Sequence, residues 1–154
     1  MTSLKTAYAD APFFKDHEPF LERIFSGTFE RLVSMNVAVL RYLLGKLDIR
    51  AEVHLQSELA PGETEPELSV AVCRRLGATA FLAQAGARKY LDAGRFEHAG
   101  IALRFFIPRP PVYPQLWGTF IPNLSVFDLL FNCGPAAKDI IRKGADTPER
   151  GIEH

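Results

Sequence analysis

The sequence predicts an α/β fold: a small, mostly parallel sheet of about three strands, with an N-terminal helical hairpin and C-terminal helices. Three observations predict it. Apolar residues recur every three or four positions between residues 13 and 47, the period of amphipathic helices. From residue 51 to residue 107, strand patterns alternate with helical ones, which is typical of a parallel sheet with crossover helices. Helical spacing then returns after residue 124. Because three strands make a small sheet, an incomplete domain is an alternative.

The N-terminal hairpin is expected from two apolar faces. The first covers residues 13–25 and contains Pro19, so a kink or a break into two short helices is predicted there. The second follows Thr28 and covers residues 29–47. Together these faces carry more apolar surface than the two helices can bury against each other. The hairpin is therefore expected to dock on another part of the chain.

The middle of the chain changes to the period of strands. Residues 51–55 alternate apolar and polar side chains, as in a strand with one wet face. Residues 79–83 are wholly apolar, as in a parallel strand covered on both faces, and residues 101–107 again alternate. Helices are expected between these strands, at residues 67–76 and 86–92. This order gives the strand–helix–strand pattern of the predicted sheet.

The C-terminal part begins with a proline-rich stretch, residues 108–114, which is expected to be extended. Ser125 is expected to cap a short helix. Asp128 is interpreted as the acidic partner of a capping box, and a buried functional acid in an apolar helix is the alternative. A final helix then ends near Lys143. We expect one α/β domain over residues 1–143 and a polar, disordered tail over residues 144–154.

Composition narrows the class of protein without indicating a reaction. Lys and Arg together number 18 and so do Asp and Glu, which argues against a nucleic-acid partner. No apolar run is long enough for a membrane-spanning helix, and Cys73 and Cys133 lack neighbouring metal ligands or partner cysteines. We therefore expect a cytoplasmic protein with buried thiols and no metal site. Nothing in the sequence indicates which cofactor, if any, it uses.

A binding site is expected where the predicted strands end, because ligands of parallel sheets bind outside the carboxyl ends of the strands. Glu58, Arg88 and Arg109 follow the three predicted strands, so they are expected around one shared pocket. Ser57 and Glu58 offer a hydroxyl and a carboxylate for acid–base catalysis. The alternative is that both simply complete the turn after a strand.

Two further groups of residues are candidates for substrate binding. Gly86 and Arg88 open a helix directly after a strand, where free backbone N–H groups suit a phosphate or carboxylate. An ordinary strand-to-helix turn is the alternative, since no Walker or GxGxxG pattern is present. The proline-constrained loop offers aromatic rings and amides that suit a sugar, or else pack onto the sheet as a lid: Tyr113, Gln115, Trp117 and Asn123.

The C-terminal half closely resembles the WbqC-like family. The specific block consists of three strings: Val112-Tyr113-Pro114-Gln115-Leu116-Trp117-Gly118, Phe120-Ile121-Pro122-Asn123-Leu124-Ser125-Val126 and Asp128-Leu129-Leu130-Phe131-Asn132-Cys133-Gly134. Weaker agreement extends the resemblance from about Tyr8 to Ile141, through strings such as Ala11-Pro12-Phe13-Phe14, Ser57-Glu58-Leu59 and Leu76-Gly77-Ala78-Thr79.

The resemblance implies a role in bacterial surface-polysaccharide (O-antigen or lipopolysaccharide) biosynthesis, such as group transfer to a nucleotide- or lipid-linked sugar. Two departures from the family are visible. Relatives usually begin with a His-x-Pro segment that would supply further strands, and nothing similar precedes Tyr8. Relatives also tend to carry a Ser-Gly-x-Gly-Gly-Arg-like loop, where residues 83–88 here read Ala-Gln-Ala-Gly-Ala-Arg.

Three interpretations follow. In the first, the protein is a transferase with a sugar-phosphate cleft formed by Ser57, Glu58, Arg88, Tyr113 and Gln115. In the second, it is a non-catalytic remnant or binding module, which would expose an apolar sheet edge and form homo-oligomers. In the third, the natural protein begins further upstream, and an in-frame His-x-Pro segment in the preceding DNA would distinguish it.

Overall fold

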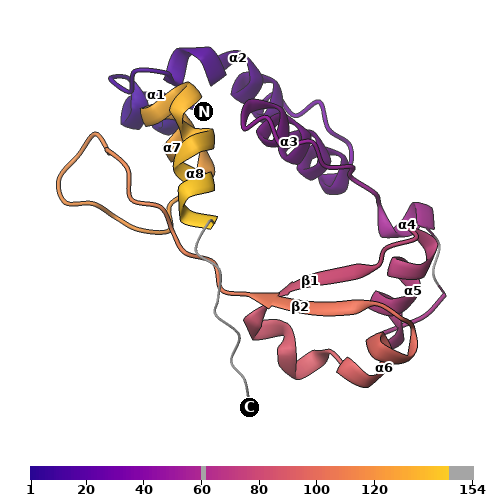
Figure 1. Cartoon of the computed structure of the whole chain (residues 1–154). Coiled ribbons are helices and arrows are strands. Elements are labelled where there is room, and N and C mark those ends of the chain that lie inside the picture. The colour runs from indigo at the N-terminus through magenta and orange to yellow at the C-terminus, as the bar shows by residue number, and fades with distance from the viewer. Residues whose placement is uncertain (60–61, 146–154) are drawn as a thin grey trace. The chain divides into compact units, whose positions relative to one another are not determined.

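The computed structural model describes residues 1–59 and 62–145 and shows a mixed helix-and-strand chain, so the predicted α/β class is confirmed (Figure 1). The chain divides into two compact units. Unit 1 contains Met1–Val53 and the described part of Arg109–Pro148, and unit 2 contains the described part of His54–Pro108. The single domain over residues 1–143 stays a prediction. Of the predicted tail, residues 146–154 lie outside the described residues.

The regular secondary structure in the described part of unit 1 is helical. Its elements are α1 (Thr2–Tyr8), α2 (Phe14–Phe25), α3 (Leu32–Lys46), α7 (Val126–Cys133), the 3₁₀ turn η2 (Gly134–Ala136) and α8 (Ala137–Ala145). The hairpin of α2 and α3 and the two C-terminal helices were expected from the apolar spacing, whereas α1 was not. Helix α2 continues through Pro19, so it does not break into two helices there. Pro19 and Lys15 are both exposed, so water can replace the one backbone hydrogen bond that the proline removes.

Helix α7 lies at the centre of unit 1, because its buried side chains belong to two hydrophobic clusters. Leu129 and Leu130 pack in one cluster with Leu47 and Tyr113. Phe131 packs in the other, whose buried members are Ala11, Phe14, Leu21 and Phe131. The apolar run of α7 therefore joins the N-terminal helices to the C-terminal part of the chain.

The position of Gly134, which follows α7, requires a glycine for two reasons, its backbone conformation and the close approach of Phe13. Its φ is +49°, a conformation that side-chain-bearing residues rarely adopt. A Cβ atom at this position would lie 2.5 Å from Cδ1 of Phe13, and the Phe13 N–H donates to the Phe131 carbonyl at 3.0 Å. The glycine therefore allows the beginning of α2 to pack against the end of α7.

Unit 2 contains the sheet. Strands β1 (Ala80–Gln84) and β2 (Ala102–Phe106) are parallel, and their register runs from the pair Ala80 and Ala102 to the pair Gln84 and Phe106. The other elements are α4 (Gln56–Leu59), α5 (Glu67–Arg75), η1 (Ala85–Tyr90) and α6 (Ala93–His98). Helices η1 and α6 lie on one face of the sheet (Figure 1). On that face Phe81 and Leu103 pack against a core of Val70, Cys73, Phe96 and Ile101.

The third predicted strand is not formed: residues 51–55 have no regular secondary structure, and the described sheet has two strands. Alternation can indicate which side chains avoid water, but a strand also needs a neighbour that completes its backbone hydrogen bonds. The border between the two units falls inside this segment. The pattern in residues 51–55 therefore predicted a sheet position that the chain does not use.

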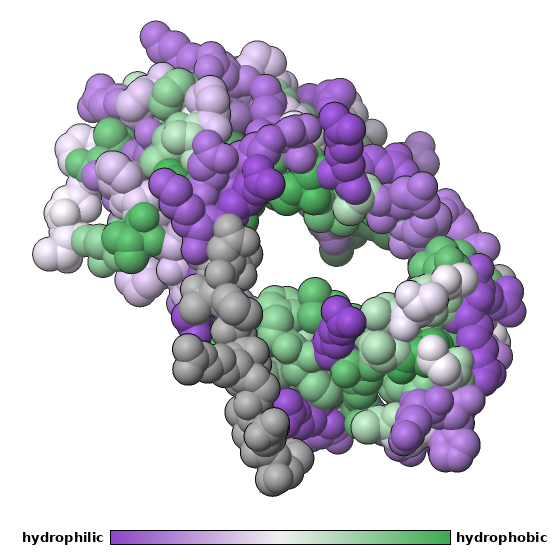
Figure 2. Space-filling model, in the orientation of Figure 1, coloured by the Kyte–Doolittle hydropathy of each residue, from purple (hydrophilic) through white to green (hydrophobic). Residues whose placement is uncertain are grey.

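The prediction that residues 79–83 are covered on both faces is also wrong. Leu82 of β1 is 63% exposed and Phe106 of β2 is 38% exposed, while the alternate residues pack inward. Figure 2 shows apolar surface over these strands. A continuous apolar run is typical of a strand between two helical layers. Here only one of the two faces carries helices of unit 2.

Candidate functional site

The first turn of α7 holds the most connected polar group of unit 1. Ser125 caps the helix as predicted, because its Oγ accepts the backbone N–H of Phe127 at 3.3 Å. Asp128 was interpreted as the second member of that cap, and this is wrong. Its side chain is 5% exposed and bonds to side chains from two other parts of unit 1. The carboxylate thus links distant segments rather than closing its own helix.

Three neutral donors surround the Asp128 carboxylate. The Tyr8 hydroxyl of α1 donates to Oδ1 at 2.8 Å, and the Tyr113 hydroxyl donates to Oδ2 at 2.8 Å. The Gln115 amide donates to Oδ2 at 3.2 Å. Within residues 1–59 and 62–145, no Lys or Arg forms an ion pair with Asp128. Burial of a charge without such hydrogen bonds would be costly, so these donors are what make the position tolerable.

The two tyrosines of this network are held in the protonated form. Burial, followed by the hydrogen bond to Asp128, raises the pKa of Tyr113 to about 12. The same two causes raise the pKa of Tyr8 well above its usual range. Both phenols therefore keep their protons at neutral pH and act as hydrogen-bond donors. Neither serves as a base or a nucleophile under these conditions.

Gln115 also closes the loop that precedes α7. Its Nε2 donates to the Ile121 carbonyl at 3.0 Å, and the Ile121 N–H donates back to Oε1 at 2.8 Å. Between them, Gly118 turns the chain with a φ of +61°. One side chain therefore fixes both ends of the segment between residues 115 and 121, and connects it to Asp128.

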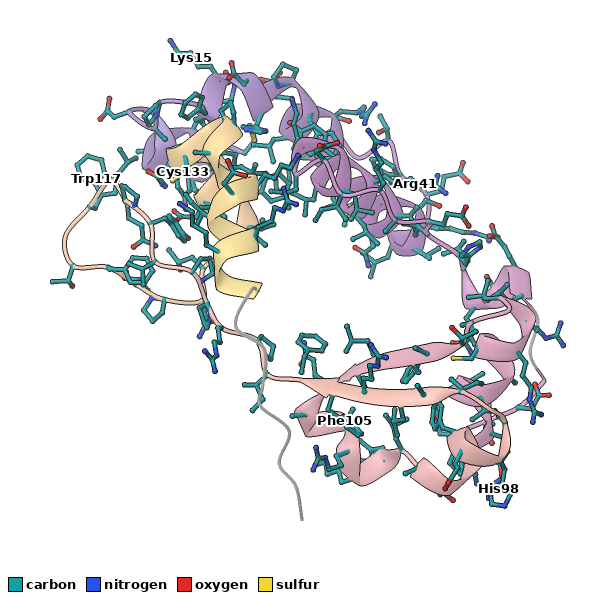
Figure 3. All side chains as sticks on the ribbon, viewed as in Figure 1. Lys15, Arg41, His98, Phe105, Trp117 and Cys133 are labelled. Carbon is teal, nitrogen blue, oxygen red and sulfur yellow. The ribbon has the colours of Figure 1, made fainter. Side chains whose placement is uncertain are left out.

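Trp117 lies on this loop, as labelled in Figure 3. Its indole N–H donates to the Ala7 carbonyl at the end of α1 at 3.2 Å, yet the side chain is 64% exposed. Asn123, further along the loop, is also exposed and has a φ of +60°. The loop thus presents a flat aromatic ring. Its position is fixed by the hydrogen bond to Ala7 and by the two hydrogen bonds between Gln115 and Ile121.

The structure brings together only some of the predicted site residues. Tyr113 and Gln115 meet at Asp128, but their polar atoms already have protein partners. Ser57 and Glu58 are exposed on the four-residue helix α4 and follow no strand, so the reason for placing them at a sheet edge no longer applies. Their catalytic role stays a prediction.

Gly86 and Arg88 lie in η1, directly after β1, as expected. The Arg88 guanidinium lies over the ring of Phe105, 4.6 Å from its centre, and Figure 3 labels Phe105 on β2. This cation–π contact supports the side chain from one side and leaves Arg88 exposed. Anion binding here stays a prediction. Arg109 belongs to unit 1 and both Glu58 and Arg88 to unit 2, so their shared pocket also stays a prediction.

Tyr8 is a site residue that sequence reasoning missed, and Asp128 was noted as a buried acid but assigned to the helix cap. A signal for Asp128 was present, since it is the one acid within the apolar run of α7, residues 126–131. No local pattern marked Tyr8, which is 120 positions away along the chain. Among the described residues, no group of three or more His, Cys, Asp or Glu side chains could hold a metal ion. None of the described helices is long and apolar enough to span a bilayer.

Comparison with known proteins identifies the family. The family model of the WbqC-like protein family matches residues 1–140. The chain belongs to the WbqC-like protein family. One relative is "Uncharacterized protein Rv1507c" of Mycobacterium tuberculosis, which is 38% identical over 86 residues. That match covers 55% of this chain and 36% of the relative, so the matched part spans about a third of the relative's length. No solved structure matches.

Proposed function

We propose that this WbqC-like protein acts on a nucleotide- or lipid-linked sugar in bacterial surface-polysaccharide biosynthesis, and that the Trp117 ring stacks on the sugar. The single observation that carries the proposal is the geometry of Trp117. The ring is 64% exposed, but its N–H is held by Ala7 and its loop is closed by Gln115. Membership of the family supports the polysaccharide role, which the resemblance of the loop block already implied.

A fixed aromatic ring is suited to binding because less conformational freedom is lost when the ligand arrives. Trp provides a large, flat apolar surface for the C–H face of a sugar. Asn123 on the same loop offers an exposed amide for the sugar hydroxyls. In this proposal Tyr113 and Gln115 position the loop through Asp128. Ser57 and Glu58 remain the predicted catalytic pair for a transfer reaction.

The test uses Trp117 as its own reporter, because it is the one tryptophan of the chain. UDP-, GDP- and dTDP-sugars and a short-chain polyprenyl-diphosphate sugar are titrated, and tryptophan fluorescence and calorimetry are recorded. We expect saturable binding to one sugar class. Trp117→Ala should weaken the calorimetric affinity by about tenfold, the effect expected for loss of one aromatic contact.

Tyr90→Ala is the matched control, since Tyr90 is an aromatic of unit 2 with a similar exposure of 66%. It should leave the affinity unchanged. An absence of binding to every sugar, or an equal loss in the two variants, would contradict the proposal.

The open face of the sheet supports self-association, which the second interpretation, a binding module without catalysis, predicts for an exposed sheet edge. Leu82 and Phe106 are exposed on this face, and Ile107, just after β2, is 60% exposed. Such a surface favours self-association. Sedimentation velocity at increasing concentration should then show a dimer, and Leu82→Lys should return it to monomer. A wild-type protein that remains monomeric at high concentration would contradict this alternative.

A further inference from the structure

The helices of unit 1 form a second candidate site, an apolar pocket of about 280 Å³ to which Trp117 does not contribute. Helices α1, α2, α3 and α7 all supply walls. Most lining residues are apolar or aromatic, among them Leu4, Phe20, Ile24, Val39, Phe127 and Phe131. The polar residues in the lining are Tyr8, Ser125 and Asp128. The pocket therefore combines a largely apolar wall with the carboxylate-bearing residue of the buried network.

The volume sets the size of the ligand. A dry apolar cavity of about 150 Å³ in another protein holds benzene. By proportion, 280 Å³ holds an apolar body of about ten non-hydrogen atoms. Such a body would be shielded by side chains that already form the core, since Phe20 is 8% exposed and Phe131 is 1% exposed.

The charge of Asp128 determines which polar group a ligand of this pocket should carry, and this polar group is called the headgroup below. Asp128 is buried and receives hydrogen bonds from neutral donors, with no Lys or Arg paired to it in the described part of the chain. A carboxylate has about four acceptor positions, and Oδ1 receives one hydrogen bond here, from Tyr8. A cationic donor would fill a further acceptor position of Oδ1 and would also balance the negative charge of the carboxylate. A neutral hydroxyl could donate a hydrogen bond but would not balance the charge.

Aromatic side chains line the same pocket as Asp128 and favour the same sign of charge. The ring centre of Tyr8 lies 4.9 Å from that of Phe131, and the ring centre of Phe127 lies 5.7 Å from that of Phe131. Faces of aromatic rings attract cations, and more strongly where water is displaced. We propose that this pocket binds a primary amine on an apolar body of about ten non-hydrogen atoms, with its ammonium group at Asp128.

Arg23 is a basic residue near the pocket that would favour a carboxylate ligand instead of an amine. Its guanidinium lies 5.3 Å from the ring centre of Phe20, which is one of the lining residues. If Arg23 rather than Asp128 selected the headgroup, the pocket would prefer a carboxylate. The headgroup preference of a ligand series with one common body therefore distinguishes the two residues.

The experiment compares n-octylamine, 1-octanol and octanoate, below their aggregation concentrations, by calorimetry with the wild-type protein. We expect octylamine to bind about tenfold more tightly than octanol, because a charge-assisted hydrogen bond replaces a neutral one, and octanoate to bind weakest. Equal affinities for the amine and the alcohol would overturn the proposal. So would preferred binding of octanoate, or no binding of octylamine.

Two variants of α3 show whether the amine occupies this pocket. Val39→Trp fills it from the α3 side and leaves Asp128 in place, so it should abolish octylamine binding. Val33→Trp adds the same side chain at an exposed position of the same helix that does not line the pocket, and should bind as wild type. Circular dichroism checks that both variants fold. Equal binding by folded Val39→Trp and Val33→Trp would overturn the assignment to this pocket.

Discussion

Asp128 of unit 1 and Asp92 of unit 2 both lie at the beginning of a helix, but their carboxylates accept hydrogen bonds from different parts of the chain. Asp92 is exposed and caps its own helix α6, because its Oδ1 accepts the Gly94 N–H at 3.0 Å. Asp128 is buried and bonds Tyr8, Tyr113 and Gln115. The role of Asp92 is a contact two residues along the chain, which sequence patterns over short distances can predict. Asp128 joins three segments of unit 1, so its role depends on the tertiary fold.

The apolar residues of the two units also differ in how many parts of the chain they pack against. Helix α7 of unit 1 is buried on several sides and contributes to two clusters. The sheet of unit 2 packs on its inner face against a single cluster, and Leu82 on its outer face stays exposed. Changes near α7 should therefore cost more free energy of unfolding than similar changes in unit 2.

The largest expected effect is that of Asp128→Ala. It leaves the hydroxyls of half-buried Tyr8 and buried Tyr113 without their acceptor, which we expect to lower the free energy of unfolding by about 4 kcal/mol. Asp92→Ala removes one exposed cap and should cost about 1 kcal/mol. Urea denaturation followed by circular dichroism of the whole chain measures both, and Trp117 fluorescence follows unit 1 separately. Equal losses would show that the buried network has no special weight.

Next in size is Gly134→Ala. The added Cβ would meet the ring of Phe13 and force a residue with a side chain into a glycine conformation, so a loss of about 3 kcal/mol is expected. Gly45→Ala is the matched control. Apart from its chain neighbours and the backbone of its own helix α3, no atom lies within 4 Å of its Cβ position, and the change should stabilise by about 1 kcal/mol. The same denaturation curves apply. A neutral Gly134→Ala would mean that Phe13 moves aside freely.

The smallest effect concerns His17 and pH. This histidine is 3% exposed, its Nδ1 lies 2.7 Å from the Tyr42 hydroxyl, and burial followed by the charge of Lys46 lowers its pKa, although Asp16 opposes this. The unfolded chain therefore binds this proton more readily than the folded one. The stabilising contribution is complete above the ordinary histidine pKa near 6.5 and decreases as the pH falls below it.

His17→Gln should remove this part of the pH dependence. Stability is measured from pH 8 to pH 5 in the two proteins, again by Trp117 fluorescence. The wild-type curve should fall more steeply than the variant curve below about pH 6.5. Parallel curves would show that His17 does not contribute to the acid sensitivity of unit 1.

Periodicity predicted α2, α3, α7 and α8 of unit 1 and the two strands of unit 2, because each depends on the side chains of its own segment. The cap at Ser125 was predictable for the same reason. The strand at residues 51–55 was not, because pairing depends on a partner that the pattern does not contain. Tyr8 and Asp128 show the same limit for the site: their contact spans 120 positions, and no local spacing encodes it.

The two hydrogen bonds between Gln115 and Ile121 have a consequence for how this loop changes in evolution. One amide joins the two ends of the loop, and Leu116 and Phe120 pack against the two hydrophobic clusters of unit 1. The chain outside the loop should therefore keep its path when only residues 117–119 at the tip are exchanged. A relative that retains this glutamine and these two packed side chains can carry a residue of different chemistry at position 117. The proposed sugar contact and the fold of the loop can then change independently.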